Sequence, residues 1–211
     1  MQLCNMKNIK AIIFDLGGVI LNINYENTIT KFEKIGVKKS SSFYSKTNQS
    51  NLFNQIEIGE ISPMKFLLKI QKKTNQASIK QIKTAWNSML ENLPKKRIEL
   101  LKNLKHNYSI FLLSNTNTIH ISEFKRRLGV KQYGEFYDLF DKVYYSHKIG
   151  FRKPQSEAFK MILNDNKLLA KEVLFIDDSI QHIEGAKKLG LKTYHLKEKE
   201  EVTTIFPDIF L

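Results

Sequence analysis

Apolar positions along the chain follow two different patterns. Four short runs, "AIIF", "IFLL", "VYY" and "VLFI", are apolar without interruption, and polar or turn residues bound each of them. An uninterrupted run of this length is typical of a strand covered on both faces, as in a parallel sheet. A last short run, "KTYHL", is expected to be one more strand. Helical spacing separates the runs after Pro94, and this alternation favours parallel βα units in an α/β, Rossmann-like core.

The stretch between the first strand and Pro94 shows helical spacing and no convincing strand. "ENTITKFEKIG" carries apolar residues three to four positions apart, and "ASIKQIKTAWNSMLENL" repeats this stripe. In "ISPMKFLLKIQKK", Ser62 is expected to cap a helix that has Pro63 at its first position. We therefore expect a small helical cap domain, residues 22–93, inserted into an α/β core domain formed by residues 1–21 and 94–211.

Composition narrows the class of protein. The chain has 211 residues and a formal net charge of +13, from 34 Lys and Arg against 21 Asp and Glu. The lysines are spread along the whole chain without stacking aromatic residues between them, so solvated helix faces explain them better than nucleic-acid binding. The positive field would attract small phosphorylated metabolites. A single cysteine, Cys4, excludes an intramolecular disulfide, and the start of the chain lacks the apolar core of a signal peptide. We expect a cytoplasmic protein that contacts neither membranes nor nucleic acid.

Residues that can do chemistry follow the apolar runs directly. The runs end in Asp15, in Ser114 and Asn115, and in Asp177 and Asp178. Taken singly, each is explained by a turn or a helix cap, and Lys153, in a loop bounded by Gly and Pro, by a solvated lysine. The carboxyl ends of parallel strands meet at one edge of the sheet, where ligands bind. Together these residues therefore favour a site.

The chemistry that suits this set is phosphoryl transfer. Asp15 can attack phosphorus and form an aspartyl-phosphate. Adjacent acids facing it would repel it unless a cation lay between them, and Mg²⁺ prefers such oxygen ligands. Hydroxyl, amide and ammonium groups would hold the remaining phosphate oxygens. Gly17 and Gly18 free the backbone for a tight exit from the strand and a close approach.

Four stretches, taken in order, resemble the motifs of the haloacid dehalogenase superfamily: "FDLGGVI", "LLSNTN", "GFRKP" and "FIDDSIQHIEGAKKLG". The resemblance covers nearly the whole chain, since that family has a small cap after the first strand. The "DLG" opening and the "LSNTN" strand end are similar to the branch of bacterial sugar-phosphate phosphatases that includes alpha-D-glucose-1-phosphate phosphatase. Four ordered motifs make a strong signal, whereas one alone would be weak.

The resemblance implies a role for each strand-end residue. Asp15 is expected to be the nucleophile, and Lys153 to balance charge on the nucleophile and the phosphate. Ser114 and Asn115 are expected to bind phosphate. The expected magnesium ligands are Asp15, the backbone carbonyl of Gly17, Asp178 directly and Asp177 through a water molecule.

One position departs from the pattern of the superfamily. Most of its phosphatases carry a second aspartate two positions after the nucleophile as general acid and base, and here that position is Gly17. Such a group contributes about 100- to 10,000-fold in rate. Its loss leaves three interpretations open. The protein is an enzyme that acts on esters with good leaving groups or takes another acid from the cap, or it is an impaired catalyst that only binds phosphorylated ligands. The third is a metal-independent 2-haloacid dehalogenase. We favour a magnesium-dependent phosphatase of a small phosphorylated metabolite, a sugar phosphate, acting through an aspartyl-phosphate.

Several further residues have competing interpretations. The turn "QIEIGEIS" offers Glu57 and Glu60 to sugar hydroxyls, although a solvated turn is the more common case. Trp86 could stack on a sugar ring, but its helical register favours the bundle core. His120 could approach the site, although a helix surface is the more common case. Asn22 and Asn24 are hinge residues or ligand contacts. For the assembly we expect a monomer or a weak homodimer.

Overall fold

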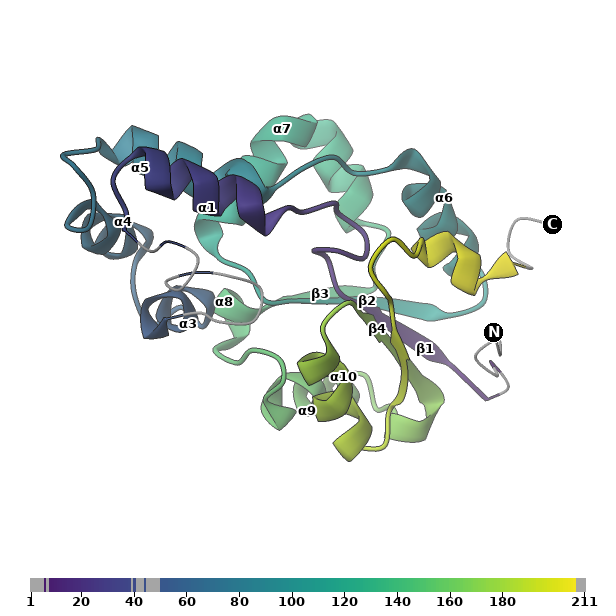
Figure 1. The fold of residues 1–211 in the computed structure, drawn as a ribbon. Helices are drawn as coiled ribbons and strands as arrows, with labels where there is room; N and C mark the ends of the chain where they lie inside the picture. The colour runs from purple at the N-terminus through teal and green to yellow at the C-terminus, as the bar shows by residue number, and fades with distance from the viewer. Residues whose placement is uncertain (1–5, 7, 39, 41–43, 45–49, 208–211) are drawn as a thin grey trace.

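The computed structural model describes residues 6, 8–38, 40, 44 and 50–207, so Cys4 lies outside the described residues. Its centre is a five-stranded sheet in which all pairs are parallel, in the order β3-β2-β1-β4-β5 (Figure 1). The strands are β1 (Ala11–Phe14), β2 (Ser109–Ser114), β3 (Lys142–Tyr145), β4 (Val173–Asp177) and β5 (Lys192–His195). The predicted parallel α/β sheet is confirmed.

The strand order decides where a ligand can bind. The chain runs outward from β1 to β2 and β3 on one side, and β4 and β5 lie on the other side. Phe14, the last residue of β1, pairs with Leu112 of β2 and with Ile176 of β4. The order of the strands therefore reverses at β1, and in open α/β sheets the crevice beyond such a point is the usual ligand site.

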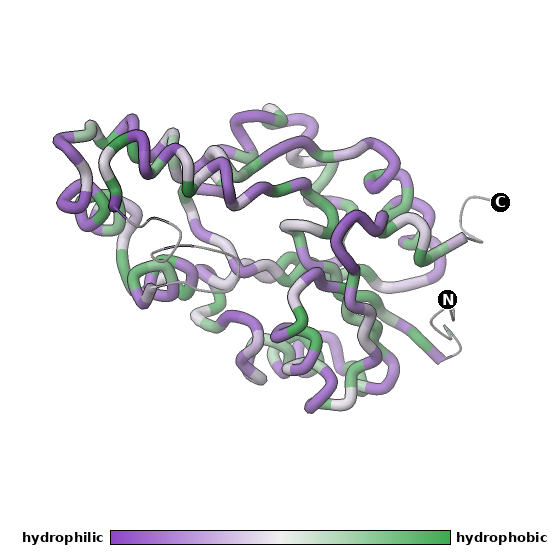
Figure 2. Tube along the Cα trace, in the orientation of Figure 1, coloured by the Kyte–Doolittle hydropathy of each residue, from purple (hydrophilic) through white to green (hydrophobic). Residues whose placement is uncertain are grey.

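Helices cover both faces of the sheet, which explains the unbroken apolar runs (Figure 1). Ile12 and Phe14 belong to the buried cluster that includes α6 (Lys95–Leu104) and α7 (Thr118–Tyr137). Ala11 and Ile13 belong to the cluster on the opposite face, with α9 (Ser156–Asp165) and α10 (Ile180–Lys188). Hydrophobic residues are accordingly concentrated in the strands, while hydrophilic stretches follow the outer helices (Figure 2). Three short helices also lie in this part of the chain: α8 (Ser146–Ile149), η2 (Ala170–Glu172) and η3 (Val202–Ile205).

The stretch between β1 and α6 is helical, and its helices lie together beyond one end of the sheet (Figure 1). We call residues 22–93 the helical segment. Ser62 caps α4 through a 3.3 Å bond from the Lys65 amide, and Ser78 forms a capping box with Gln81 at the start of α5. The helices of the helical segment are α1 (Tyr25–Lys34), α3 (Asn51–Glu57), α4 (Pro63–Gln71), α5 (Ile79–Trp86) and η1 (Asn87–Met89). The last apolar stripe thus ends as an α-helix at Trp86, earlier than its spacing predicts.

An aromatic cluster holds the helical segment together. Trp86 is fully buried, and the rings of Phe32, Tyr44, Phe53 and Phe66 lie 4.7–6.1 Å from its ring. Aromatic pairs at these separations add about 0.5–1.5 kcal/mol each beyond the burial of their area. The expectation that Trp86 belongs to the bundle core is therefore confirmed. Among the described residues, no helix is long and apolar enough to cross a membrane.

Candidate active site

A cavity of about 370 Å³ opens at the carboxyl ends of the strands, between the sheet and the helical segment. Six of the predicted site residues line it: Asp15, Gly17, Ser114, Asn115, Lys153 and Asp178. Asp177 is fully buried behind the wall of the cavity. The opposite wall comes from the helical segment and includes Tyr25, Tyr44, Asn54 and Glu57. The strand ends thus bring together residues that lie up to 163 positions apart, as the parallel sheet predicts (178 − 15).

Lys153 is completely buried and joins two of the acids. Its Nζ lies 2.9 Å from Oδ1 of Asp15 and 2.7 Å from Oδ2 of Asp177. Burial alone would lower the pKa of Lys153, but the two carboxylates raise it above its usual range. The lysine is therefore a charged link between two strand ends rather than one of the solvated lysines of the surface.

Asp15 follows β1 and is held by its own loop. Its Oδ1 accepts a 2.7 Å hydrogen bond from the backbone N–H of Leu16, in addition to the contact with Lys153. Burial raises the pKa of Asp15 to about 8; Lys153 opposes the rise, and Asp177 and Asp178 add to it. Because two neighbouring carboxylates raise this pKa and one ammonium group opposes the rise, a further cation would favour the ionised form of Asp15.

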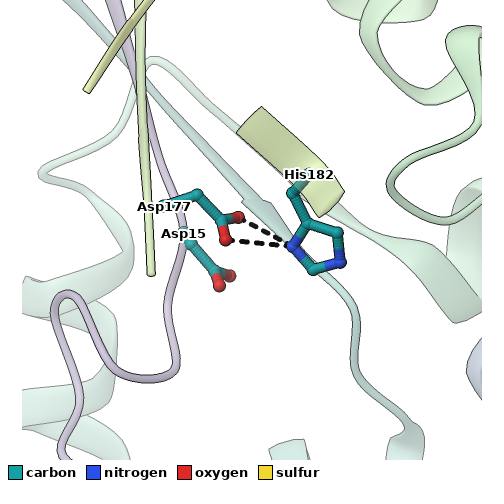
Figure 3. A group of neighbouring side chains, drawn as sticks. All are labelled: Asp15, Asp177 and His182. Atoms are coloured by element: carbon teal, nitrogen blue, oxygen red, sulfur yellow. Dashed lines mark hydrogen bonds and ion pairs between the residues drawn. The ribbon is translucent and has the colours of Figure 1, made fainter. Parts of the chain in front are cut away.

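Asp177 is engaged on both of its oxygens. Oδ2 pairs with Lys153, and Oδ1 accepts a 2.8 Å bond from the Ser179 amide. His182, on α10, places Nδ1 at 3.0 and 3.1 Å from the two oxygens (Figure 3). Burial would raise the pKa of Asp177, but Lys153 and His182 hold it below its usual range. His182 was not singled out in the sequence, although it lies five positions after Asp177, within one turn or so of the following helix.

Asp178 explains the second glycine of the loop. A Cβ built on Gly18 would lie 2.5 Å from Oδ2 of Asp178, and Gly18 has a φ of +78°. Only glycine adopts this conformation at little cost and leaves room for the carboxylate. The loop after β1 therefore packs directly against the Asp178 carboxylate. Asp15 and Asp178 line the same cavity, which is the arrangement that a shared cation requires.

The donor set fits magnesium better at the cavity than at the most compact cluster. Ligand atoms of Asp15, Asp177 and His182 all lie within 4.8 Å of one another. However, both oxygens of Asp177 already accept protein donors, and a histidine nitrogen is a poor ligand for a hard cation. Asp15 and Asp178, with the carbonyl of Gly17, offer oxygen atoms on the cavity side instead. These three residues would hold Mg²⁺ directly, and the expected contact of Asp177 through a water molecule stays a prediction.

The Asn115 side chain contacts the loop that carries Lys153. Its Nδ2 donates to the carbonyl of Lys153, and its Oδ1 accepts from the Lys153 amide, both at 2.9 Å. The amide group thus clamps the loop that carries the lysine, because the two strand ends are neighbours. This contact gives Asn115 a positioning role for Lys153, and its binding of phosphate stays a prediction.

The helical segment contributes an acid that lies inside the cavity rather than in water. Glu57 is only 5% exposed and forms a 2.9 Å ion pair with Arg152, which precedes Lys153 in the chain. Burial raises the pKa of Glu57, and Arg152 opposes this shift. The favoured expectation of a solvated turn is therefore wrong for Glu57, while Glu60 is indeed exposed. Arg152 was not identified from the sequence.

His120 also differs from its expectation. It is buried, lines the cavity and stacks on Trp86 with ring centroids 4.4 Å apart. Its Nε2 lies 3.2 Å from the carbonyl of Trp86, and Nδ1 lies 3.2 Å from Nδ2 of Asn117. Burial lowers the pKa of His120 to about 4, so the ring is neutral. The placement on a helix surface is wrong because α7 packs against the helical segment.

Asn22 and Asn24 lie at the crossing from the sheet to the helical segment. The Asn22 side chain donates to Oδ1 of Asn92 at 3.0 Å, and Oδ1 of Asn24 accepts from the Glu26 amide at 3.0 Å, capping α1. Neither residue is among those that line the cavity. The two residues were expected to be hinge residues or ligand contacts. Their hydrogen bonds favour a structural role, at the point where the chain enters and leaves the helical segment.

Comparison with known proteins decides the family. A family model described as a haloacid dehalogenase-like hydrolase matches residues 9–190. The chain belongs to this family. It is 28% identical over 202 residues to a D-ribitol-5-phosphate phosphatase of Bacteroides thetaiotaomicron, covering 93% of this chain and 98% of the relative. The predicted enzyme class, a hydrolase of this superfamily, is confirmed, and the activity of this relative agrees with the predicted phosphatase.

Solved structures support the same assignment. The wild-type HAD family enzyme bt-2542 of Bacteroides thetaiotaomicron, in complex with magnesium and inorganic phosphate, is 35% identical, with a TM-score of 0.81 over 94% of this chain and 99% of that chain. A HAD-like family hydrolase of Porphyromonas gingivalis is 29% identical, with a TM-score of 0.81 over 96% of both chains. Magnesium in the first of these agrees with the predicted cofactor.

Proposed function

We propose that this hydrolase is a magnesium-dependent phosphatase of a small sugar or sugar-alcohol phosphate, acting through an aspartyl-phosphate. The observation that carries the proposal is the convergence of Asp15, Lys153 and Asp178 at the point where the strand order reverses. The phosphatase activity of the D-ribitol-5-phosphate phosphatase, and the magnesium and phosphate bound to the enzyme bt-2542, support it. The helical segment, as a cap, would cover the reacting group.

The first step is attack on phosphorus by Asp15. Both of its contacts, from Leu16 N–H and Lys153 Nζ, fall on Oδ1, which leaves Oδ2 to form the bond to phosphorus. The ester oxygen leaves with the electron pair of the broken P–O bond. Lys153 offsets negative charge on Asp15 and on the phosphoryl oxygens, and the hydroxyl of Ser114 donates to one of them. Bound to Asp15, Asp178 and the Gly17 carbonyl, magnesium would supply further charge neutralisation.

The second step is hydrolysis of the aspartyl-phosphate by water, which restores Asp15 and releases inorganic phosphate. Protonation of the leaving alkoxide cannot come from position 17, because Gly17 has no side chain. Glu57 lies in the cavity, but its ion pair with Arg152 opposes the protonated form. A preference for an anomeric ester, with its better leaving group, remains a prediction. The ribitol phosphate of the named relative is a primary ester and favours the opposite outcome.

Release of inorganic phosphate tests the proposal. The purified protein is assayed on D-ribitol 5-phosphate, glucose 1-phosphate and glucose 6-phosphate, with magnesium and with a chelator. We expect turnover only with magnesium, and a loss of about 1,000-fold or more for Asp15→Asn. Asp138→Asn, an exposed aspartate at the end of α7, should match the wild type. Binding of these esters without release of phosphate would support the impaired catalyst instead, and halide release from a 2-haloacid without metal would support the dehalogenase.

A further inference from the structure

One charged contact in the cavity is not used by the phosphoryl-transfer residues. Arg152 lies in the loop between α8 and α9, and its guanidinium reaches the helical segment at two points of α3. Nη2 lies 2.9 Å from Oε2 of Glu57, and Nη1 donates to Oδ1 of Asn54 at 2.5 Å, one turn earlier. All three side chains line the cavity. The pair therefore forms part of the wall that faces the strand ends.

The backbone fixes the position of this pair. Gly59, two residues after Glu57, has a φ of +76°, and a Cβ there would lie 2.6 Å from the carbonyl of His147 in α8. The turn after α3 thus packs against the backbone of α8 with no room for a side chain at position 59. Arg152 follows α8 in the chain, so this contact holds the end of α3 beside the loop that carries Arg152.

Burial makes the charges of the pair depend on each other. Glu57 is 5% exposed, and the Arg152 side chain is 22% exposed. A carboxylate buried to this extent stays ionised when a cation compensates its charge. The partly buried guanidinium likewise needs the carboxylate as its counter-ion. The pair is neutral as a whole, yet it presents acceptors and donors to the cavity. Hydroxyl groups can bond to both members, whereas an additional anion would meet the buried carboxylate.

We propose that Glu57 and Arg152 form the subsite for the non-phosphate end of the substrate and select a neutral, polyhydroxylated leaving group over one with a second negative charge. This inference rests on the proposed phosphatase function. Glu57 neutralises Arg152, which otherwise would attract an anionic group, and Glu57 itself repels one. The residues are specificity determinants, separate from Asp15 and Lys153, which act on the phosphoryl group.

Two matched esters test the selection. D-Ribitol 5-phosphate ends in a hydroxymethyl group, and 5-phosphoribonate has the same chain with a carboxylate at that end. We expect the wild type to favour the polyol in kcat/KM by about tenfold or more. Glu57→Gln should reduce this ratio by about tenfold, through a lower KM for the carboxylate ester. Arg152→Gln should change the ratio in the opposite direction.

The control is an acid on the same turn. Glu60→Gln removes the same charge from an exposed residue that does not line the cavity, and should leave the ratio unchanged. A purely structural role of the pair predicts equal losses on both esters in Glu57→Gln and in Arg152→Gln, and that result would overturn the subsite.

Failure of the proposed function is distinguishable from failure of the subsite. p-Nitrophenyl phosphate has no polyol end, so its magnesium-dependent hydrolysis reports the phosphoryl-transfer residues alone. An unchanged ratio in Glu57→Gln with this hydrolysis intact overturns the subsite only. If p-nitrophenyl phosphate is not hydrolysed, the phosphatase proposal fails. The dissociation constants of the two esters, measured by calorimetry, then test the subsite, and an unchanged ratio in Glu57→Gln overturns it.

Discussion

The two walls of the cavity differ in how they are built and in the charge that they carry. On the strand-end wall, Asp15 and Asp177 share Lys153, Asp178 lines the same cavity, and the positions follow from the parallel sheet. On the helical wall, Glu57 and Arg152 neutralise each other, and their meeting depends on how helices pack. Acids predominate on the first wall, which is where we expect the metal and the phosphate. The ion pair on the second wall is where the proposed subsite for a neutral group lies.

The largest expected effect comes from Lys153. Lys153→Met keeps most of the volume but leaves two buried carboxylates without their shared cation, and breaking such a contact costs about 3–5 kcal/mol. We expect both a loss of turnover and a lower free energy of unfolding, measured by denaturant titration. Adding Asp177→Asn should restore part of the stability and none of the activity. If the single variant were as stable as the wild type, the charge imbalance of the strand-end wall would be refuted.

His120 tests how tightly the two walls are joined. The pKa of His120 is lowered from 6.5 to about 4 by burial, so the unfolded chain binds a proton that the folded chain does not between these values. Stability is therefore unaffected by this group above pH 6.5 and decreases as the pH falls toward 4, by up to roughly 3 kcal/mol. Unfolding free energies across this range should show a flatter profile for His120→Phe. His106→Gln, which removes an exposed imidazole instead of the buried one, is the control variant.

The contrast between the walls also explains what the sequence could predict. Asp15, Ser114 and Asp177 each end an apolar run, and the rule that parallel strands end at one edge was sufficient to bring them together. Glu57 has no such rule. It is the last residue of α3 in a turn that looks solvated, and it is buried beside Arg152, a distant neighbour that no local pattern contains.

His120 and Arg152 were missed for a related reason. His120 lies in the first turn of α7, and only the packing of the helical segment against that turn buries it on Trp86. Arg152 stands beside the recognisable Lys153, but its partners are about a hundred positions earlier in the chain. In each case the local spacing correctly predicts a helix or a loop. The residue that the side chain contacts is distant in the sequence, so only the tertiary structure shows it.

Gly18 tests whether backbone alone positions Asp178. With its φ of +78° and only 2.5 Å to the Asp178 carboxylate, Gly18→Ala introduces strain of about 1–2 kcal/mol and displaces that side chain. We expect a higher magnesium concentration for half-maximal activity, measured by metal titration. Gly190→Ala is the matched control, since its φ is +84° and its nearest neighbour, Cβ of Ala170, lies at an ordinary 3.8 Å. If both variants needed the same raised magnesium concentration, backbone strain, and not contact with Asp178, would be the cause of the increase.

The smallest expected effect separates support of the helical wall from contact with the ligand. Asn24 caps α1 next to Tyr25, which lines the cavity, so a structural and a ligand-binding role predict different losses. Asn24→Ala removes the cap and should cost about 1 kcal/mol of stability while KM stays near the wild-type value. Asn24→Ser restores an acceptor and should recover most of the loss in thermal unfolding. A several-fold rise in KM with unchanged stability would instead make Asn24 a ligand contact, and the helical wall would then extend into the crossing between the two parts of the chain.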